Sequence, residues 1–353
     1  MTTVTMTSLQ RVLTTLGHNE PDRIPLFLLV TLHGAKELGL SIGDYFARAE
    51  NVAEGQIRLR AKFGHDCLYS FFYAPVEIEA WGGEVIFRDD GPPNSGTPFI
   101  GDPEQILRLK PPEIERTPCL AKVLQATEMM KARAGDDCPI IGVVISPFSL
   151  PVMQMGFDRY LDLMEDRPDL FERLMQVNEA FCVAWANAQL RAGATAICYF
   201  DPVSSPTIVP PDLYRRTGFA IAKRTLARIQ GATATHMASG RGLPILGEIA
   251  QTGTAAVGVS AMEDLAEVKA ACRGKLTVLG NLNGIEMRRW IGAEAEAAVR
   301  KAIAQAGPGG GFILSDNHGE IPWQVPDEVL LTIAEATRRW GSYPLQETEF
   351  HGR

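Results

Sequence analysis

The chain has 353 residues, 46% of them hydrophobic and 22% charged, which is the composition of an ordinary globular protein. A chain of this length can bury one large core, so we expect a single domain over residues 1–353. Because 42 Asp and Glu outnumber 34 Lys and Arg, and the basic residues form no cluster, we expect neither a nucleic acid nor a membrane as a partner.

Cysteine usage and the first residues bear on the compartment. The six cysteines are scattered, include no Cys-x-x-Cys pair and mostly lie in apolar runs, which is typical of buried thiols in a reducing environment. Residues 1–9 lack the basic and apolar regions of a secretory signal, and no apolar run approaches the roughly 20 residues of a membrane span. We therefore expect a cytoplasmic protein.

Along the chain, short apolar runs alternate with longer segments of helical period, as in βα units that build a parallel sheet. The predicted strands are Ile24–Val30, Cys67–Phe72, Ile140–Ile145, Ala196–Phe200, Thr233–His236, Ala255–Ser260, Leu276–Gly280 and Phe312–Ser315. The clearest predicted helices are Arg159–Arg191, Pro211–Gln230, Met262–Cys272, Glu294–Ala306 and Asp327–Trp340. Parallel strands buried on both faces are continuously apolar, as Ile140–Ile145 is. The pattern predicts a distorted (α/β)8 barrel of the TIM type.

Residues 76–118 break this alternation. Glu84–Phe87 is followed by a turn-forming run that contains Gly91, Pro92 and Pro93. This pattern favours a β-hairpin over a crossover helix, so we expect a hairpin insertion near the mouth of the barrel.

Polar residues that directly follow the predicted strands are the candidates for chemistry, because active sites of such barrels lie at the carboxyl ends of the strands. These residues are Thr31–His33, Asp201–Pro202, His236–Arg241, Asn281–Asn283 and Asp316–Glu320. Three of the six histidines fall at these positions.

Each candidate also has a purely structural interpretation. A histidine at a strand end is often a buried hydrogen-bonding group, Asp201 before Pro202 can start a turn, and the asparagines can be rim hydrogen-bonders. If the imidazoles of His236 and His318 meet with a carboxylate such as Asp201, Asp316 or Glu320, the nitrogen and oxygen ligands suit zinc with one open position. No local spacing of two histidines supports this metal site.

Five segments together resemble the uroporphyrinogen decarboxylase superfamily, and the resemblance covers nearly the whole chain. They are Arg11–Pro25, Ser146–Leu150, Phe200–Asp201, Gly280–Leu282 and Ser315–Pro322. The resemblance implies a distorted (α/β)8 barrel with one of two activities: decarboxylation of a tetrapyrrole, or methyl transfer to or from the cobalt of a corrinoid protein.

The decarboxylases of this superfamily resemble the chain at Asn317-His318-Gly319, but they carry an Arg-rich segment after the first strand that binds substrate carboxylates. Here residues 28–33 contain no cation, and residues 69–73 lack the Asp that holds the pyrrole nitrogens. An octa-anionic substrate would be left largely unpaired, at a cost of several kcal/mol. We therefore favour the methyltransferases.

The methyltransferases that use coenzyme M hold zinc through a His-x-Cys-Gly element and a later Cys. This chain resembles them at His236 but has Ala238 in place of the first Cys, and His318 lies close to the place of the second. Replacing thiolates by imidazole and carboxylate leaves a harder zinc ion, which suits an oxygen leaving group. The departure therefore favours a methyl ether, such as a methoxylated aromatic, as the substrate.

Our hypothesis is a cobalamin-dependent methyltransferase that moves a methyl group between a small methylated substrate and a corrinoid protein. His236, His318 and Asp201 are the expected catalytic residues, and His236, His318 and Glu320 the expected zinc ligands. The expected substrate-binding residues are His33, Phe72, Tyr73, Glu79, Phe148, Met153, Asn281, Asn283, Asp316 and Trp323. The chain lacks an Asp-x-His-x-x-Gly element, so we expect the cobalamin on a separate partner protein.

Two alternatives stay open. A decarboxylase-like lyase could use Asp201 and His318 as acid and base without a metal. A barrel that only binds a corrinoid or tetrapyrrole would have no turnover. The apolar substrate-binding candidates also have an equally good interpretation as ordinary barrel packing.

Overall fold

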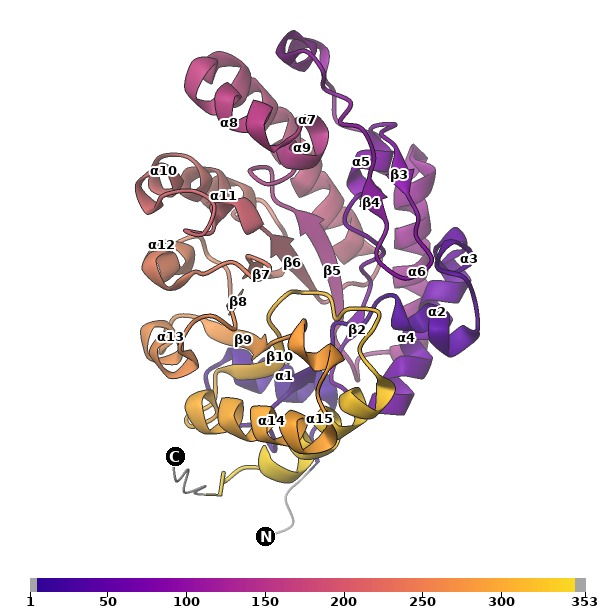
Figure 1. The fold of residues 1–353 in the computed structure, drawn as a ribbon, viewed down its shortest axis with the longest axis vertical. Coiled ribbons are helices and arrows are strands. Elements are labelled where there is room, and N and C mark those ends of the chain that lie inside the picture. The colour runs from indigo at the N-terminus through magenta and orange to yellow at the C-terminus, as the bar shows by residue number, and fades with distance from the viewer. Residues whose placement is uncertain (1–4, 347–353) are drawn as a thin grey trace.

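A computed structural model describes residues 5–346, and its core is a curled sheet of eight parallel strands (Figure 1). The strand order is β1-β10-β9-β8-β7-β6-β5-β2. The bounds are β1 Leu26–Phe27, β2 Leu68–Tyr69, β5 Ile140–Ile145, β6 Ala196–Phe200, β7 Ala232–His236, β8 Ala256–Gly258, β9 Thr277–Leu282 and β10 Phe312–Asp316. This architecture confirms the predicted (α/β)8 barrel. Residues 1–4, part of the stretch in which we expected no secretory signal, lie outside the described residues.

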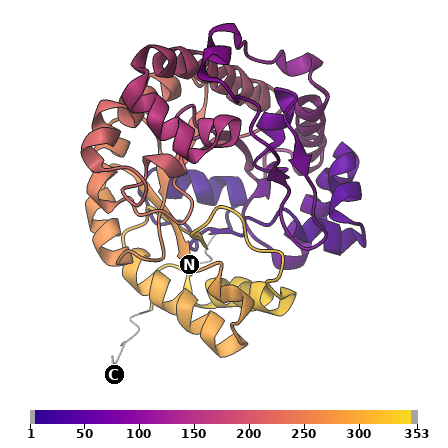
Figure 2. The ribbon, with the colours of Figure 1, turned by 45° about the horizontal axis from the view of Figure 1, so that its top comes forward.

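Helices surround the sheet in both ribbon views (Figures 1 and 2). They are α1 Ser8–Leu16, α2 His33–Leu38, α3 Ile42–Ala47, α4 Ala49–Phe63, α5 Val76–Ala80, α6 Pro118–Ala134, α7 Pro151–Met155, α8 Phe157–Asp166, α9 Pro168–Arg191, α10 Pro211–Arg216, α11 Gly218–Leu226, α12 Leu246–Ala250, α13 Leu265–Cys272, α14 Gly292–Ala306 and α15 Asp327–Trp340. Within residues 5–346, none of them has the length and apolarity needed to cross a bilayer.

Two predicted helices are each divided in the structure. The helix predicted over residues 159–191 breaks at Arg167, because Pro168 disfavours the helical conformation of the residue before it and starts α9 instead. The helix predicted over residues 211–230 breaks at Thr217, whose backbone is not helical. Both breaks lie in segments whose apolar period continues through them, so periodicity alone does not reveal them.

The first two strands are shorter than predicted, because no strand ladder joins β1 to β2. Side chains replace it. The Asp66 carboxylate accepts a hydrogen bond from the Leu26 amide at 2.9 Å, and the Asp66 amide donates to the Leu26 carbonyl at 2.7 Å. The Gln56 amide group donates to Val30 O at 2.6 Å and accepts from Tyr69 N at 3.0 Å. Buried backbone groups at this seam are therefore satisfied without strand pairing.

The predicted hairpin insertion is present. Val85–Ile86 (β3) pairs antiparallel with Asn94–Ser95 (β4), and the insertion also contains α5 and two short 3-10 turns. Gln324, in the loop after β10, donates to the carbonyl of Asp90 at 2.8 Å. The hairpin therefore contacts the rim of the barrel at the carboxyl ends of the strands.

Alternate strand residues face the lumen of the barrel. On β7 these are Ala232, Ala234 and His236, and the register pairs Ala234 with Cys198 and Ala256, and His236 with Phe200 and Gly258. We call the first set the base layer (Cys198, Ala234 and Ala256) and the second the mouth layer (Phe200, His236 and Gly258). The layers are two residues apart along the same three strands.

Candidate active site

His236 is the fully buried last residue of β7 and belongs to the mouth layer. Its ring stacks on Phe200, with 5.3 Å between ring centroids and an angle of 12° between the ring planes. On the other side lies Gly258, where an added Cβ would stand 2.1 Å from the imidazole. The site therefore requires a glycine on β8 to leave room for the ring.

The hydrogen bonds of His236 fix which nitrogen carries the proton. The amide of Ala238 donates to Nδ1 at 3.0 Å, and Nε2 is buried without a hydrogen-bond partner. Burial, aided by the nearby His318, lowers the pKa of His236 to about 3. A neutral imidazole that accepts at Nδ1 must carry its proton on Nε2. His236 therefore presents an unused N–H donor at the mouth.

The loop after β10 lies directly over this ring. Asp316 Oδ2 accepts hydrogen bonds from the amides of His318 and Gly319, both at 2.8 Å. At Gly319, whose φ is +89°, an added Cβ would lie 2.6 Å from Phe200 and 3.3 Å from His236. Glycine is required here both for the backbone conformation and for the close approach.

Asp316 keeps one oxygen unused. Its Oδ1 is buried without a hydrogen-bond partner, and burial raises the pKa of the carboxyl group. The loop hydrogen bonds of Oδ2 mean that Asp316 shapes the loop as well as bringing an acceptor to the site. Asp316 was predicted as a substrate-binding residue and as one of three carboxylates that could complete a zinc site.

His318 and Glu320 face different neighbours. The exposed His318 pairs through Nδ1 with Ser239 Oγ at 2.9 Å, which links the loops after β10 and β7. Glu320 accepts a hydrogen bond from Thr31, and burial raises the pKa of Glu320 to about 7. Each predicted zinc ligand therefore already has a protein partner at one of its polar atoms.

Asp201 is fully engaged in holding loops together. Ser146 and Ser149 donate to its Oδ1 at 2.5 and 2.7 Å, and Ser204 donates to its Oδ2 at 2.5 Å. Burial raises the pKa of this carboxyl group, and the three hydroxyl groups oppose the rise. With both oxygens satisfied, Asp201 acts here as a positioning residue for the loops after β5 and β6, although it was predicted as catalytic.

One further residue of the lumen face was not singled out by sequence. Ser315 is registered with Asn281, and its buried Oγ has no hydrogen-bond partner. Phe71, an aromatic residue that sequence also indicated for the mouth, packs beside Tyr69 with ring centroids 5.7 Å apart. Counting every second residue from Ile313 along β10 would have identified Ser315. Asn281, which was predicted, donates to Ser260 O at 3.0 Å.

Most of the aromatic candidates lie in packing instead of the lumen. Phe72 packs on Phe46 of α3, and Phe148 packs edge-on against Tyr160 in the outer helix layer. Tyr73 donates to Glu79 at 2.6 Å, so these two predicted residues satisfy each other. Phe71 packs with Tyr69 on the lumen side, whereas its neighbour Phe72 packs outward on Phe46.

The other predicted binding residues have local partners. Asn283 accepts from the amides of Ile285 and Glu286 and so caps a turn. The Trp323 ring lies under Lys36, 4.2 Å from its Nζ. Met153 packs on the hydrophobic cluster that contains Phe72 and Tyr73. The buried His33 is the first residue of α2, and burial lowers its pKa to about 4. None of these four contacts brings a side chain to His236.

The predicted zinc ligands do not form a metal site. Among residues 5–346, no three His, Cys, Asp or Glu side chains are placed to hold an ion together. His236 cannot ligate through Nε2 while Ala238 N–H occupies Nδ1, because Nε2 then carries the proton. The residues present therefore do not fit zinc, which corrects the set of His236, His318 and Glu320.

Comparison with known proteins places the chain in a broad group. Residues 7–340 match the uroporphyrinogen decarboxylase (URO-D) family. The chain is 27% identical over 318 residues to a methylcobamide:CoM methyltransferase MtaA of Methanosarcina barkeri, covering 86% of this chain and 91% of that protein. It is 25% identical over 352 residues to a uroporphyrinogen decarboxylase of Xylella fastidiosa, covering 93% and 98%. A methyltransferase structure from Methanosarcina mazei superposes with a TM-score of 0.82 at 19% identity, covering 95% and 99%, which shows a shared fold.

Proposed function

Since the chain belongs to the uroporphyrinogen decarboxylase family, we propose that it is a cobalamin-dependent methyltransferase that moves a methyl group between a small methylated substrate and a corrinoid protein. The methylcobamide:CoM methyltransferase among its relatives supports this chemistry. The six buried, free cysteines support a reducing compartment, and we place the enzyme in the cytoplasm.

The observation that carries the proposal is the buried His236 with an unused Nε2–H donor. It lies in the lumen between Phe200 and Gly258, under the loop that contains Gly319. A buried donor without a partner is costly in a folded protein, so its retention points to a ligand that accepts this hydrogen bond. An ether oxygen is such an acceptor.

The chain's own residues then do two things. Phe71 and Phe200 offer apolar surface to the methyl-bearing group. His236 Nε2–H donates to the oxygen that keeps both electrons of the broken methyl–oxygen bond, and this stabilises the negative charge that develops there. The oxygen finally takes a proton from solvent. A partner's cobalamin, when bound, supplies the cobalt centre and the electron pair that accept the methyl group.

Zinc has no part in this scheme, because its predicted ligands do not converge. The oxygen of the substrate is bound by a fixed imidazole donor instead of a Lewis acid. The preference for an ether over a thiol therefore rests on the Nε2–H donor and on Ala238, which has no thiolate.

The test is methyl transfer to free cob(I)alamin from a panel of methyl ethers, including methoxylated aromatics, and of methyl thioethers and methylamines. We expect methylcobalamin to form fastest with ethers, and the rate to survive treatment with EDTA. Turnover only with sulfur compounds, or loss of activity on chelation that zinc restores, would contradict the site as described. Carbon dioxide release from uroporphyrinogen would favour the lyase, and tight cobalamin binding without turnover a carrier.

A further inference from the structure

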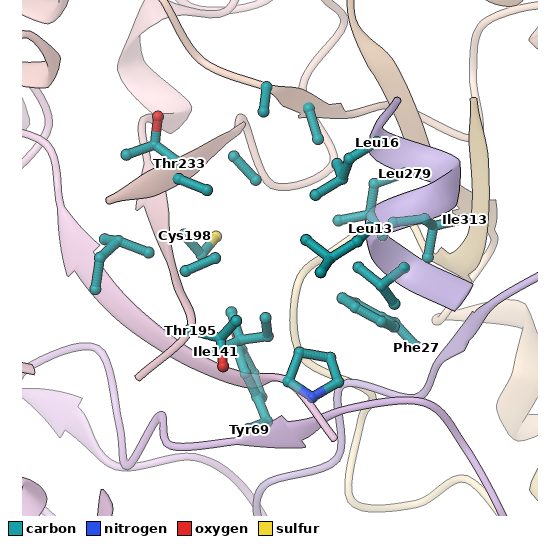
Figure 3. A pocket seen from close by; sticks show the side chains of 18 of the residues that line it. Leu13, Leu16, Phe27, Tyr69, Ile141, Thr195, Cys198, Thr233, Leu279 and Ile313 are labelled. Atoms are coloured by element: carbon teal, nitrogen blue, oxygen red, sulfur yellow. The ribbon is translucent and has the colours of Figure 1, made fainter. Parts of the chain in front are cut away.

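The lumen is not filled at its base. A cavity of about 90 Å³ lies along the barrel axis and is lined by residues of all eight strands and of α1. Figure 3 shows Leu13 and Leu16 of α1 on one side of this space and Cys198 on the other. The cavity is at the end of the barrel opposite the mouth.

Small side chains on three strands create the cavity. Barrels of eight parallel strands are normally filled by layers of bulky branched side chains. Here β6, β7 and β8 contribute Cys198, Ala234 and Ala256, while β1 and β2 opposite contribute Phe27 and Tyr69. The large side chains of β1 and β2 do not reach the small side chains of β6, β7 and β8, so the base layer stays open.

The lining excludes water. A buried water needs two to four polar partners, but the hydroxyl groups that line the cavity are already engaged. Thr195 accepts from Ile140 N at 3.1 Å, Thr233 donates to Thr254 at 3.4 Å, and Tyr69 donates to Gly319 O at 2.9 Å. Burial raises the pKa of the Cys198 thiol to about 12, so this group is neutral. An occupant must therefore be apolar.

The cavity has an entrance at α1. Leu13 lines the cavity although 55% of its surface is exposed, whereas Val12 on the same helix is buried. The helix is fixed beside this opening by Arg11, which pairs with Asp22 and Asp66 at 2.7 Å each. A ligand could thus pass Leu13 without displacing the helix.

Two residues of the cavity wall also contact the loop that lies over the active site. Tyr69 lines the cavity and bonds to the carbonyl of Gly319, and Leu29 lines it and accepts from Ile321 N at 3.0 Å. Two residues of the cavity wall therefore hold the loop that covers His236. A molecule in the cavity would support this loop from below.

We propose that the base of the barrel is a second ligand site, which takes a small apolar molecule without hydrogen-bonding groups through the opening at Leu13. An engineered cavity of about 150 Å³ in another protein stays dry and binds benzene or xenon, so a smaller dry cavity suits xenon or a short hydrocarbon. The site does not depend on which reaction the mouth of the barrel catalyses.

Xenon and n-butane are the probes, with 1-propanol as a polar compound of similar size. With the full-length protein we expect one xenon site, seen by xenon-pressurised crystallography between Ala234 and Tyr69, and a higher Tm in n-butane but not in 1-propanol. Xenon found only elsewhere, or an equal rise in Tm with 1-propanol, would overturn the proposal.

Variants distinguish xenon binding in this cavity from nonspecific xenon binding elsewhere on the protein. Ala234→Leu fills the cavity and should weaken xenon binding at least about tenfold, because interiors tolerate little overlap. Ala234→Val is the milder variant if the leucine does not fold, and it should weaken binding less. Ala132→Leu, the same change on the exposed face of α6, should leave binding unchanged. Unweakened binding in both Ala234 variants would refute the site.

Discussion

The two layers of the lumen differ although the same three strands build them. In the mouth layer, His236 has a buried polar atom without a partner, and Ser315 on β10 has another. In the base layer, Cys198, Ala234 and Ala256 leave space without filling it. An unpaired donor and an empty volume both lower stability, the first through lost hydrogen bonding and the second through lost dispersion contacts. The barrel thus gives up stability at both ends, through a missing hydrogen bond at the mouth and through missing packing contacts at the base.

The largest expected effect is at the mouth. His236→Ala removes the N–H donor and should lower kcat/KM for methyl transfer by about 10²–10³-fold, as loss of one preorganised donor does in other enzymes. The measurement is methylcobalamin formation from the best ether of the panel, with the melting temperature recorded alongside.

His318→Ala is the matched control, because it makes the same change at an exposed imidazole that bonds only to Ser239 in the described structure. We expect a loss of less than about tenfold, since a screened surface hydrogen bond contributes little. Equal losses in the two variants would mean that the buried donor has no special role.

Asp201, unlike His236, has hydrogen-bond partners at all its polar atoms. Substituting it should therefore lower stability more than activity. Asp201→Ala leaves the hydroxyls of Ser146, Ser149 and Ser204 without their acceptor and should cost about 3 kcal/mol of unfolding free energy in urea titrations. Asp201→Asn keeps an acceptor and should cost less. A fall in kcat/KM far beyond that explained by the unfolded fraction would restore Asp201 to the catalytic role first predicted.

Glu77 of α5 offers a comparison outside the lumen. Its carboxylate contacts the last residue of β5, at the mouth end of the barrel, but Glu77 itself lies in the outer helix layer. One oxygen accepts from Ile145 N at 2.9 Å, the other is buried without a partner, and burial raises the pKa to about 8. The folded state therefore binds a proton that the unfolded state releases above its ordinary pKa near 4.5. Consequently, unfolding free energy should fall as the pH rises from 4.5 to 8 and then level off.

Glu77→Gln removes this pH dependence. The amide keeps the acceptor for Ile145 N and stays neutral, so the stability of the variant relative to the native protein should increase by about 3 kcal/mol between pH 5 and pH 8. Urea unfolding at several pH values measures it. A constant difference across this range would show that Glu77 is not protonated in the folded protein.

Features that arise from local sequence could be predicted, and features that depend on distant residues could not. The eight strands and α15 were predicted because continuous apolar runs and helical periods arise from local burial. The seam between β1 and β2 was not, since Gln56 and Asp66 replace strand pairing from distant parts of the chain.

For the site, sequence correctly placed His236 and the loop of residues 316–320 at the strand ends. It could not tell which atoms are already engaged: three serines from two loops occupy Asp201, and a backbone amide sets the proton position on His236. It also could not reveal the cavity, because an alanine in a strand predicts burial equally well whether or not its opposite neighbour reaches it.

The smallest expected effect is at the base. Ala234→Val adds two carbons where the cavity has room and should raise the unfolding free energy by about 1 kcal/mol, because a filled cavity regains roughly 24 cal/mol per Å³. The corresponding change in a packed part of the barrel, Ala186→Val on α9, should instead destabilise by about 1–3 kcal/mol through overpacking. Urea unfolding of both variants shows whether the base layer is empty or is filled by neighbouring side chains. If Ala234→Val were as destabilising as Ala186→Val, the base layer would already be filled, and the contrast between the two ends of the lumen would reduce to the polar groups at the mouth.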